Sequence, residues 1–437
     1  MIPPPPTRVC FRAAATLSSM ALWLLSMELF ADDWPQWRGP QRDGTWRESG
    51  VIESFPADGL KIRWRAEVGS GWSSPVVAEG RVFVADAMLK APQARERVQC
   101  FDAASGERLW TYAEDVSYPD WAFGGDQNAG PTATPAVVDG YVYALGGNGS
   151  VQCLVAATGE VRWRHDLAKE YEIPVLQCRA SPLIDGDLLI LFVGGKPNAC
   201  VVALDRHSGK VLWKALNEPV SNSSPIIIVA GGQLQLIVWT GESVTSLDPD
   251  TGTIFWREPM MTSNNDAVAT PVSVGDLLLV SGLMFKLDGE KPAASILWPE
   301  NRGVAKRVLS NTSTAMLTGE LVFSATSRGA LVCLDARTGS ELWHTEQVTD
   351  QKSGPSIHLT PNGDRVFLYT NAGELIHARL TRAGYEEMSR APLLTPVYPF
   401  GGRKVTWSPP AFAQGHVFAR NEREVVCASL RADVPPK

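Results

Sequence analysis

Seven residues with chemically varied side chains occupy one repeated place in this chain. Each stands three positions before the proline, or before Ala315 where the proline is missing, at the start of a short apolar segment. The set combines two aromatic faces, one fixed positive charge and three polar groups, a mixture suited to binding a small molecule or a saccharide. The alternative is a solvated funnel whose polar residues only satisfy backbone groups. In chain order the residues are Trp72, Thr132, Arg179, Asn222, Val268, Thr312 and Trp407.

Other signatures of catalysis are missing from the sequence. The six histidines are scattered, and no pair has the spacing of zinc ligands. Neither a G-x-S-x-G motif nor a phosphate-binding loop occurs. The sequence therefore offers nothing in favour of a hydrolase or a nucleotide-binding enzyme. Asn264, Asn265, Asp266 and Asn311 add further polar groups close to the repeated positions.

A repeated structural unit should position these residues, because six segments of the chain end in nearly the same sequence. Asp102–Trp110, Val155–Trp163, Asp205–Trp213, Asp248–Trp256, Asp288–Trp298 and Asp335–Trp343 mostly read Asp-x-x-Ser/Thr-Gly followed by an apolar stretch and Trp. Successive tryptophans are 42 to 53 residues apart. Such a period, built from short β-branched runs and Gly turns, is typical of a β-propeller. In each copy we expect Asp to cap the turn, Gly to supply positive φ, and Trp to wedge between neighbours.

The first full copy predicts a blade of four antiparallel strands within residues 74–110. Two degenerate copies end the series, one near 353–388 and one near 405–430, and the last has no fourth strand. The series instead begins with an orphan fourth strand, 62–68. Pairing this strand with the last copy would remove the free sheet edges. We therefore predict an all-β, eight-bladed propeller closed by the N-terminal strand, with seven blades as the alternative.

The segments outside the ring have distinct characters. Residues 1–31 resemble a secretory signal, with Arg8 and Arg12 before an apolar stretch and Ala31 as a candidate cleavage point. A retained membrane anchor is the alternative. Residues 32–60 form a leader with tryptophans and turn residues, which we expect to pack on the ring. The propeller covers 61–430, and 431–437 form a tail. The predicted localisation is periplasmic or secreted, with no membrane span after signal cleavage.

Alternating strand directions give the ring two unlike faces. Tight turns such as Glu79-Gly80 and Ser105-Gly106 crowd one face, here called the short-turn face. Longer connections lie on the other, the long-loop face, where binding sites on rigid scaffolds usually occur. The seven repeated positions stand at this mouth of the central channel. The long connections are 111–131, 164–178, 257–268, 299–310 and 389–406.

The net charge limits the classes of binding partner, and the positions of the cysteines indicate whether disulfides form. The net charge is −7 with no run of Lys or Arg, which disfavours nucleic acid and anionic membranes. Four cysteines share one place in their repeats, which indicates small buried residues rather than disulfides. Cys178 and Cys200 fall in one repeat, and a bridge between them is left open. The four repeated cysteines are Cys100, Cys153, Cys333 and Cys427.

The repeat ending in Asp102–Trp110 resembles that of the pyrroloquinoline-quinone (PQQ) propellers, over about residues 61–430. That family includes eight-bladed quinoprotein dehydrogenases and the non-enzymatic assembly factor BamB. The leader 34–40, Trp-Pro-Gln-Trp-Arg-Gly-Pro, is similar to the opening of secreted PQQ-like propellers of unassigned function. The resemblance implies an eight-bladed ring, and either PQQ with Ca²⁺ in the funnel or a platform for partner proteins.

Carried onto this chain, a dehydrogenase would use Trp72 or Trp407 as the quinone platform and Arg179 to neutralise a cofactor carboxylate. Asp266 would be the catalytic base, or a metal ligand with Asn222. The chain lacks the vicinal cysteines and large insertions of several such enzymes. We therefore expect a non-catalytic binding or scaffold propeller. Its partner would be a protein, a small molecule or a saccharide at the long-loop face, and the alternative is a PQQ- and Ca²⁺-dependent alcohol or sugar dehydrogenase.

Overall fold

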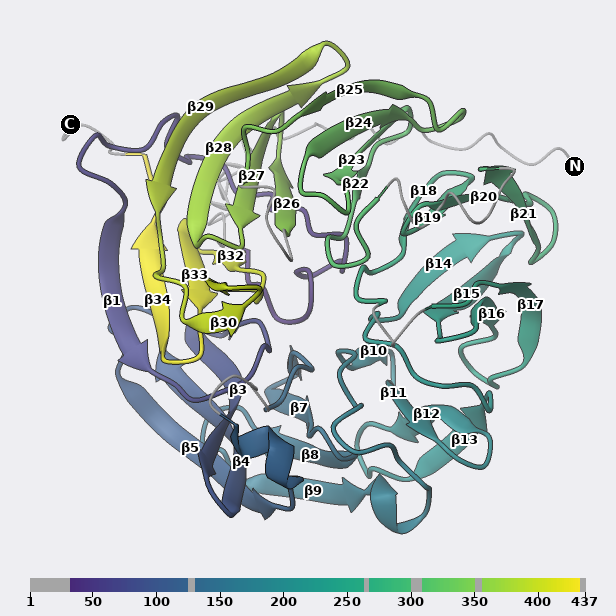
Figure 1. The fold of residues 1–437 in the computed structure, drawn as a ribbon. Helices are drawn as coiled ribbons and strands as arrows, with labels where there is room; N and C mark the ends of the chain where they lie inside the picture. Colours follow the sequence, from purple (N-terminus) through teal and green to yellow (C-terminus); the bar gives the residue numbers. More distant parts are fainter. Residues whose placement is uncertain (1–31, 125–129, 263–266, 300–308, 350–355, 433–437) are drawn as a thin grey trace, which may run out of the picture. The chain divides into compact units, whose positions relative to one another are not determined.

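Eight four-stranded antiparallel sheets form a ring in the computed structural model of this chain (Figure 1). The structure describes residues 32–124, 130–262, 267–299, 309–349 and 356–432. Both degenerate copies form complete sheets, so the prediction of eight blades is confirmed and the seven-blade alternative is wrong. Within the described ranges, no helix has the length and apolar character needed to cross a bilayer.

The first four blades follow the chain in order, from the innermost strand to the outermost. Blade 1 contains β2 (Val76–Ala78), β3 (Arg81–Lys90), β4 (Gln93–Asp102) and β5 (Arg108–Val116). Blade 2 contains β6 (Ala136–Val138), β7 (Tyr141–Leu145), β8 (Ser150–Val155) and β9 (Val161–Asp166). Blade 3 contains β10 (Leu183–Asp185), β11 (Leu188–Gly195), β12 (Ala199–Asp205) and β13 (Val211–Ala215). Blade 4 contains β14 (Ile226–Ala230), β15 (Gln233–Trp239), β16 (Ser243–Leu247) and β17 (Ile254–Pro259).

The remaining blades continue the ring. Blade 5 contains β18 (Val272–Val274), β19 (Leu277–Val280), β20 (Leu283–Leu287) and β21 (Ala294–Trp298). Blade 6 contains β22 (Met316–Leu317), β23 (Leu321–Ala325), β24 (Leu331–Asp335) and β25 (Glu341–Thr345). Blade 7 contains β26 (Ile357–Asn362), β27 (Arg365–Thr370), β28 (Glu374–Thr381) and β29 (Gly384–Pro392). Blade 8 contains β32 (Ala411–Ala413), β33 (His416–Arg420), β34 (Glu424–Ser429) and β1 (Lys61–Glu67).

Three short elements lie in the connections. The 3₁₀ turns η1 (Asp120–Phe123) and η2 (Leu167–Lys169) follow blades 1 and 2, and the hairpin β30 (Tyr398–Phe400) and β31 (Arg403–Val405) precedes blade 8. Strands β3 to β5 run further than the sequence predicts, so part of the long connection expected from residue 111 is strand. All of these additions lie on the long-loop face.

The N-terminal strand closes the ring as predicted. β1 pairs antiparallel with β34, from Lys61 opposite Ser429 to Glu67 opposite Glu424. The buried Arg420 of β33 reinforces the seam with blade 1 by donating to the carbonyls of Ala85 (2.9 Å) and Gly69 (2.6 Å). Closure thus pairs the N-terminal strand with the C-terminal strand inside blade 8, which leaves that blade without an unpaired third strand.

Six outer-strand tryptophans dock onto the next blade. In each, the indole N–H donates to a carbonyl in the turn between the third and fourth strands of that blade, and Trp64 bonds the carbonyl of Ala103 at 2.9 Å. In the first such turn, Asp102 Oδ1 accepts from the backbone N–H groups of Ala104 and Ser105, so the Asp caps it as expected. The six are Trp64, Trp110, Trp163, Trp213, Trp298 and Trp343.

Trp256 makes a different hydrogen bond, although its ring still packs on the next blade as expected, 5.6 Å from Phe285 of β20. Its indole N–H donates to Gln235 Oε1 within its own blade, at 3.0 Å. The next blade carries Asp288-Gly-Glu-Lys-Pro292 in place of the usual turn, and Gly289 there has no positive φ. Without the tight Gly turn, the indole N–H bonds within its own blade, while the ring keeps its contact with Phe285.

Substitution of the turn glycine should weaken the closing seam. Gly106 has φ +76°, and a Cβ there would lie 2.6 Å from the Trp64 ring. Gly140 has φ +75° but has open space around it. Both Ala variants carry the strain of positive φ, roughly 1–2 kcal/mol. We expect Gly106→Ala to lower the free energy of unfolding by about 1–3 kcal/mol more than Gly140→Ala, because the indole must move. Equal losses in urea unfolding would contradict this role of the indole.

The leader crosses the centre of the ring at its short-turn face (Figure 1, purple). Trp34 pairs with Val77 of β2 through two backbone hydrogen bonds of 2.8 and 2.9 Å, and the carbonyl of Pro35 accepts from Val137 of β6. On the far side, the N–H of Trp46 donates to the carbonyl of Pro361 in β26. The leader therefore satisfies edge groups of inner strands that would otherwise line the channel unpaired.

The cores lie between neighbouring blades. The cluster at the closing seam brings leader residues Trp34 and Trp46 onto Phe367 and Phe412 of blades 7 and 8. All six described cysteines are free and buried, so the bridge left open between Cys178 and Cys200 is not formed. Residues 1–31, with the expected signal segment, lie outside the described residues.

Candidate functional site

The repeated positions form a rim around the channel on the long-loop face. Each rim residue precedes an inner strand, and the backbone N–H groups of Trp72, Asn222 and Val268 donate to the next blade. The N–H of Trp72 donates to the carbonyl of Pro131 (3.0 Å), and that of Asn222 to Ala267 (2.9 Å). The N–H of Arg179 instead donates to the carbonyl of Gln177 in its own connection. The alignment on the prolines assigns no residue of blade 7 to the rim.

A belt of buried hydroxyl groups lies two residues further along the inner strands. Each hydroxyl oxygen accepts a hydrogen bond from a backbone N–H of the preceding blade. The four bonds measure 2.9 to 3.0 Å. These bonds hold the inner strands in register, so the rim residues stand at one level. The accepting side chains are Thr134, Ser181, Ser224 and Thr314.

The two rim tryptophans come together. The rings of Trp72 and Trp407 lie 5.4 Å apart between centroids, tilted by 59°. Tyr398 of the β30–β31 hairpin lies 5.3 Å from Trp72 and 5.5 Å from Trp407, and Phe400 lies 4.7 Å from Trp407. The four rings, here called the aromatic cluster, are partly exposed. Blades 1 and 8 thus contribute one contiguous aromatic surface beside the channel.

Polar contacts fix this cluster in place. The indole N–H of Trp72 donates to Glu422 Oε1 at 3.0 Å, from the loop between β33 and β34. His358 of β26 bonds the carbonyl of Trp407 through Nε2 at 3.0 Å, and burial lowers the pKa of this imidazole to about 4. The imidazole is therefore neutral at physiological pH and acts as a hydrogen-bond donor to the backbone.

Arg179 is the positive group of the rim. Its Nε–H donates to the carbonyl of Leu176 at 2.8 Å, and burial lowers the pKa of its guanidinium, opposed by the nearby Tyr398. In the described part of the chain, Arg179 makes no ion pair. The rest of its guanidinium fork can therefore meet an acceptor on a bound molecule.

The other predicted residues are more dispersed. Thr312 is exposed, and its hydroxyl bonds that of Ser310 at 2.8 Å, whereas Thr132 and Asn222 are half-buried in different blades. Asp266, with Asn264 and Asn265, lies outside the described residues. The structure thus brings Trp72 and Trp407 into contact, with Tyr398 linking them to Arg179, but it does not gather Thr132, Asn222 and Thr312 around a common point.

Large apolar side chains are exposed on the same face. Met88 at the end of β3, Trp121 in η1 and Val175 before blade 3 are 51%, 52% and 55% exposed. Met261 and Phe400 add two more from the connections that follow blades 4 and 7. Contiguous exposed apolar groups beside polar ones are typical of protein interfaces. Trp121 and Val175 flank a small buried group formed by Tyr118, Ala122 and Leu176.

Sequence reasoning missed Tyr398, Phe400 and Glu422. The first two lie in a segment read as a loop, although Tyr-Pro-Phe-Gly-Gly-Arg-Lys-Val is two short runs separated by a Gly-Gly pair. That pattern is a recognisable hairpin signal. Glu422 carries no such signal, because only the fold brings the loop after β33 against Trp72.

The described residues fit a quinone with Ca²⁺ poorly. Trp72 and Trp407 contact each other, and each also contacts Tyr398, at tilted or edge-on ring angles. Among the described residues, no group of three or more His, Cys, Asp or Glu side chains is placed to hold a metal ion. We therefore derive no quinone chemistry from this site.

BamB proteins and quinoprotein dehydrogenases are among the known proteins that this chain resembles. A family model described as outer membrane protein assembly factor BamB matches residues 48–126, 94–345 and 290–384. The BamB of Shewanella oneidensis is 22% identical over 57% of this chain and 68% of that protein. The BamB of Burkholderia pseudomallei is 27% identical over 51% and 56%. Quinoprotein alcohol dehydrogenase PedH of Pseudomonas putida is 28% identical over 32% of this chain and only 25% of the enzyme.

Solved structures show the same ring. BamB from Moraxella catarrhalis aligns with a TM-score of 0.57 and 16% identity, over 85% of this chain and 99% of that one. Quinohemoprotein alcohol dehydrogenase from Comamonas testosteroni aligns with a TM-score of 0.60 and 15% identity, over 93% and 82%. At these identities the likeness shows the fold alone.

Proposed function

Because this chain belongs to the family of outer membrane protein assembly factor BamB, we propose that it is an extracytoplasmic, non-catalytic propeller that binds another protein. The partner contacts the long-loop face, at the aromatic cluster and at the exposed side chains beside it. The observation that carries the proposal is the exposure of Met88, Trp121 and Val175 together on this face.

The chemistry of the face suits a protein partner. Large exposed apolar and aromatic groups supply the area buried in an interface, and Trp, Met and Arg are enriched in interface cores. Arg179 offers a guanidinium fork for a carboxylate or a backbone carbonyl of the partner. The cluster of Trp72, Trp407, Tyr398 and Phe400 is tied together by ring contacts, so its surface is pre-organised.

Site-specific photocrosslinking in the source organism tests the proposal. A photoreactive phenylalanine analogue would replace Trp121, Val175 or Phe400 on the long-loop face. Ala104, exposed in a tight turn of the short-turn face, is the matched control position. We expect a discrete higher-mass adduct from the first three positions and none from position 104, because the partner occupies one face.

Two outcomes would count against the proposal. Adducts of equal yield at position 104 would indicate non-specific collisions, and no adduct at any long-loop position would remove the partner from this face. If adducts form, Trp121→Ser with Val175→Ser should reduce the adduct at position 400 about tenfold or more, since buried aromatic anchors dominate interface energies.

The second candidate is a PQQ- and Ca²⁺-dependent dehydrogenase, favoured by the relatives of that class and by Arg179 beside two tryptophans. Titration of the purified protein with PQQ and Ca²⁺, followed by a dye-coupled alcohol assay, tests it. Saturable binding with turnover would replace the scaffold proposal and direct attention to Asp266 and Arg179. Binding of a saccharide to the aromatic cluster would be detected as quenching of Trp fluorescence when glycans are added.

We also propose that residues 1–31 are a secretion signal and that the mature protein is periplasmic or secreted. The membership of the family above supports an extracytoplasmic site. Cell fractionation with an N-terminal sequence of the mature chain tests this, because export predicts a start near Asp32. A full-length chain in the cytoplasm would contradict it.

A further inference from the structure

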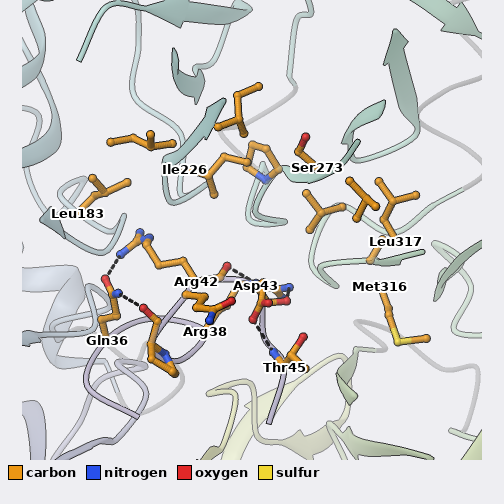
Figure 2. Close-up of a pocket in the computed structure, with 18 of the residues that line it drawn as sticks. Gln36, Arg38, Arg42, Asp43, Thr45, Leu183, Ile226, Ser273, Met316 and Leu317 are labelled. Carbon is orange, nitrogen blue, oxygen red and sulfur yellow. Dashed lines mark hydrogen bonds between the residues drawn. The ribbon is translucent and has the colours of Figure 1, made fainter. Parts of the chain in front are cut away.

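A second opening lies at the other end of the channel, on the short-turn face. There the leader and the inner strands of blades 3 to 6 enclose a cavity of about 380 Å³. Figure 2 shows leader residues Gln36, Arg38 and Arg42 on one side and Ile226, Ser273, Met316 and Leu317 on the other. This volume is within the range of small-molecule sites. It involves none of the residues of the aromatic cluster.

Two arginines lie in the wall of this cavity without a carboxylate partner. Arg42 donates from Nη1 and Nη2 to the carbonyls of Pro182 (2.8 Å) and Pro225 (3.1 Å), and Arg38 donates to the carbonyls of Arg42 and Asp43. No ion pair in the described part of the chain involves either guanidinium. The Nε–H of Arg42 is buried and has no hydrogen-bond partner.

The electrostatics of the cavity favour an anion. Burial lowers the pKa of Arg42 to about 9, and the charge of Arg38 lowers it further in the same direction. Asp43 also lines the cavity, but it is paired with Arg47. Asp43 interacts with Arg38 as well as with Arg47, and the other lining carboxylate is Asp185, whose pKa burial raises. A bound anion would relieve the repulsion between the two arginines and satisfy the remaining N–H groups.

The opposite wall of the cavity carries apolar side chains beside Asp185 and Ser273. Leu183, Ile226, Val272, Met316 and Leu317 come from the inner strands of four successive blades. An inorganic anion would leave this wall in contact with water only, whereas an organic anion would bury apolar surface there, worth about 25 cal/mol for each Å². The wall therefore selects for a ligand with an apolar body behind its charged group.

From this arrangement we propose that the cavity binds an organic carboxylate with an apolar body. The carboxylate contacts Arg38 and Arg42, and the body lies along the wall from Leu183 to Leu317. Two sources share this chemistry: a fatty acid, and the C-terminal end of an apolar peptide. A peptide has a precedent within the fold, because Trp34 of the leader already pairs with the inner strand β2 through two backbone hydrogen bonds.

Calorimetric titration of the full-length protein tests the site with four probes. These are decanoate, decanamide, a peptide Ala-Val-Leu-Val-Val with a free carboxylate, and the same peptide amidated. We expect saturable binding of at least one carboxylate, with its neutral counterpart about tenfold weaker or more, because two charge-assisted hydrogen bonds are lost. Binding of decanoate alone identifies a fatty-acid site, and binding of the peptide acid alone identifies a peptide site.

Matched variants assign the binding to this cavity. Arg38→Gln removes one charge, and Met316→Trp fills the cavity while leaving both arginines and the leader contacts. Arg328→Gln, which removes an exposed charge from the β23–β24 connection on the long-loop face, and Met316→Leu, which keeps the volume, are the controls. We expect the first two to weaken binding about tenfold or more and the controls to change it less than about threefold.

Each result of these titrations either supports or overturns binding in this cavity. Unchanged melting temperatures establish that Arg38→Gln and Met316→Trp are folded, and if one is not, the other carries the test. Binding that survives both, or no binding of either carboxylate to the native protein, overturns the proposal. Its failure would leave the function proposed for the long-loop face untouched, because crosslinking at position 121 does not depend on this cavity.

Discussion

Replacing Trp46 by Ala should lower the free energy of unfolding by about 3–5 kcal/mol, the cost of emptying a large buried aromatic site. Trp46 is only 1% exposed. Its ring lies 5.6 Å from Phe367 of blade 7 and 5.4 Å from Phe412 of blade 8. The indole thus anchors the leader where the ring closes, and the variant loses both packing and the anchor.

Two measurements check this prediction. Urea unfolding followed by Trp fluorescence gives the free energy, and limited proteolysis reports whether residues 32–60 have become accessible. Trp121→Ala is the matched control, since that side chain is 52% exposed and its loss should change stability by no more than about 0.5 kcal/mol. Similar losses for the two variants would show that the leader does not stabilise the ring.

Acidification from pH 6.5 to pH 4 should destabilise the protein. Burial lowers the pKa of His358 to about 4, and that of His377 also to about 4, with the charge of Arg365 adding to the second. The ordinary value is about 6.5, so the unfolded chain binds more protons than the folded chain in this window. Stability is complete above pH 6.5, falls between pH 6.5 and 4, and is not lost further through these groups below pH 4.

The size of the effect follows from the shifts. Each pKa unit corresponds to about 1.4 kcal/mol, so the fall from about 6.5 to about 4 corresponds to roughly 3–4 kcal/mol for each imidazole. His377 stacks on Phe367 at 4.7 Å and 4°, and Phe55 lies 6.1 Å away, so it has little access to water when protonated. Burial raises the pKa of Glu96, which opposes part of the loss.

Unfolding curves recorded at about pH 7.0, 5.5 and 4.5, which sample the predicted window, measure this loss of stability. His377→Phe and His358→Gln remove the two titrating groups, and His207→Gln, on the exposed short-turn face, is the control. The native protein and the control should lose stability with falling pH, and the double variant should lose much less. An unchanged pH slope in the double variant would assign the acid sensitivity to other groups.

The repeat was enough to predict the ring, and the reason is local. Asp102 caps its turn through neighbouring N–H groups, Gly106 holds a positive φ, and Trp64 fills the space above it. These interactions involve residues at fixed sequence spacing, so the same letters produce the same blade. The orphan strand 62–68 was also informative. The last copy lacks a fourth strand, so the edge of its third strand needs another strand to pair with. Where the turn sequence differs, at Asp288–Pro292, the hydrogen bond of the Trp256 indole differs as well.

Function depends on contacts that no local pattern encodes. Trp72 and Trp407 are more than 300 residues apart in the chain, and only ring closure brings their rings to 5.4 Å, with Tyr398 and Phe400 of an unexpected hairpin against them. The sequence by itself predicted the propeller, with eight blades as the favoured number, and proposed which residues stand at the rim. The tertiary structure decided that the leader closes the opposite mouth and leaves a cavity with Arg38 and Arg42 in its wall, because that outcome depends on where a non-repeating segment docks against blades distant from it in sequence.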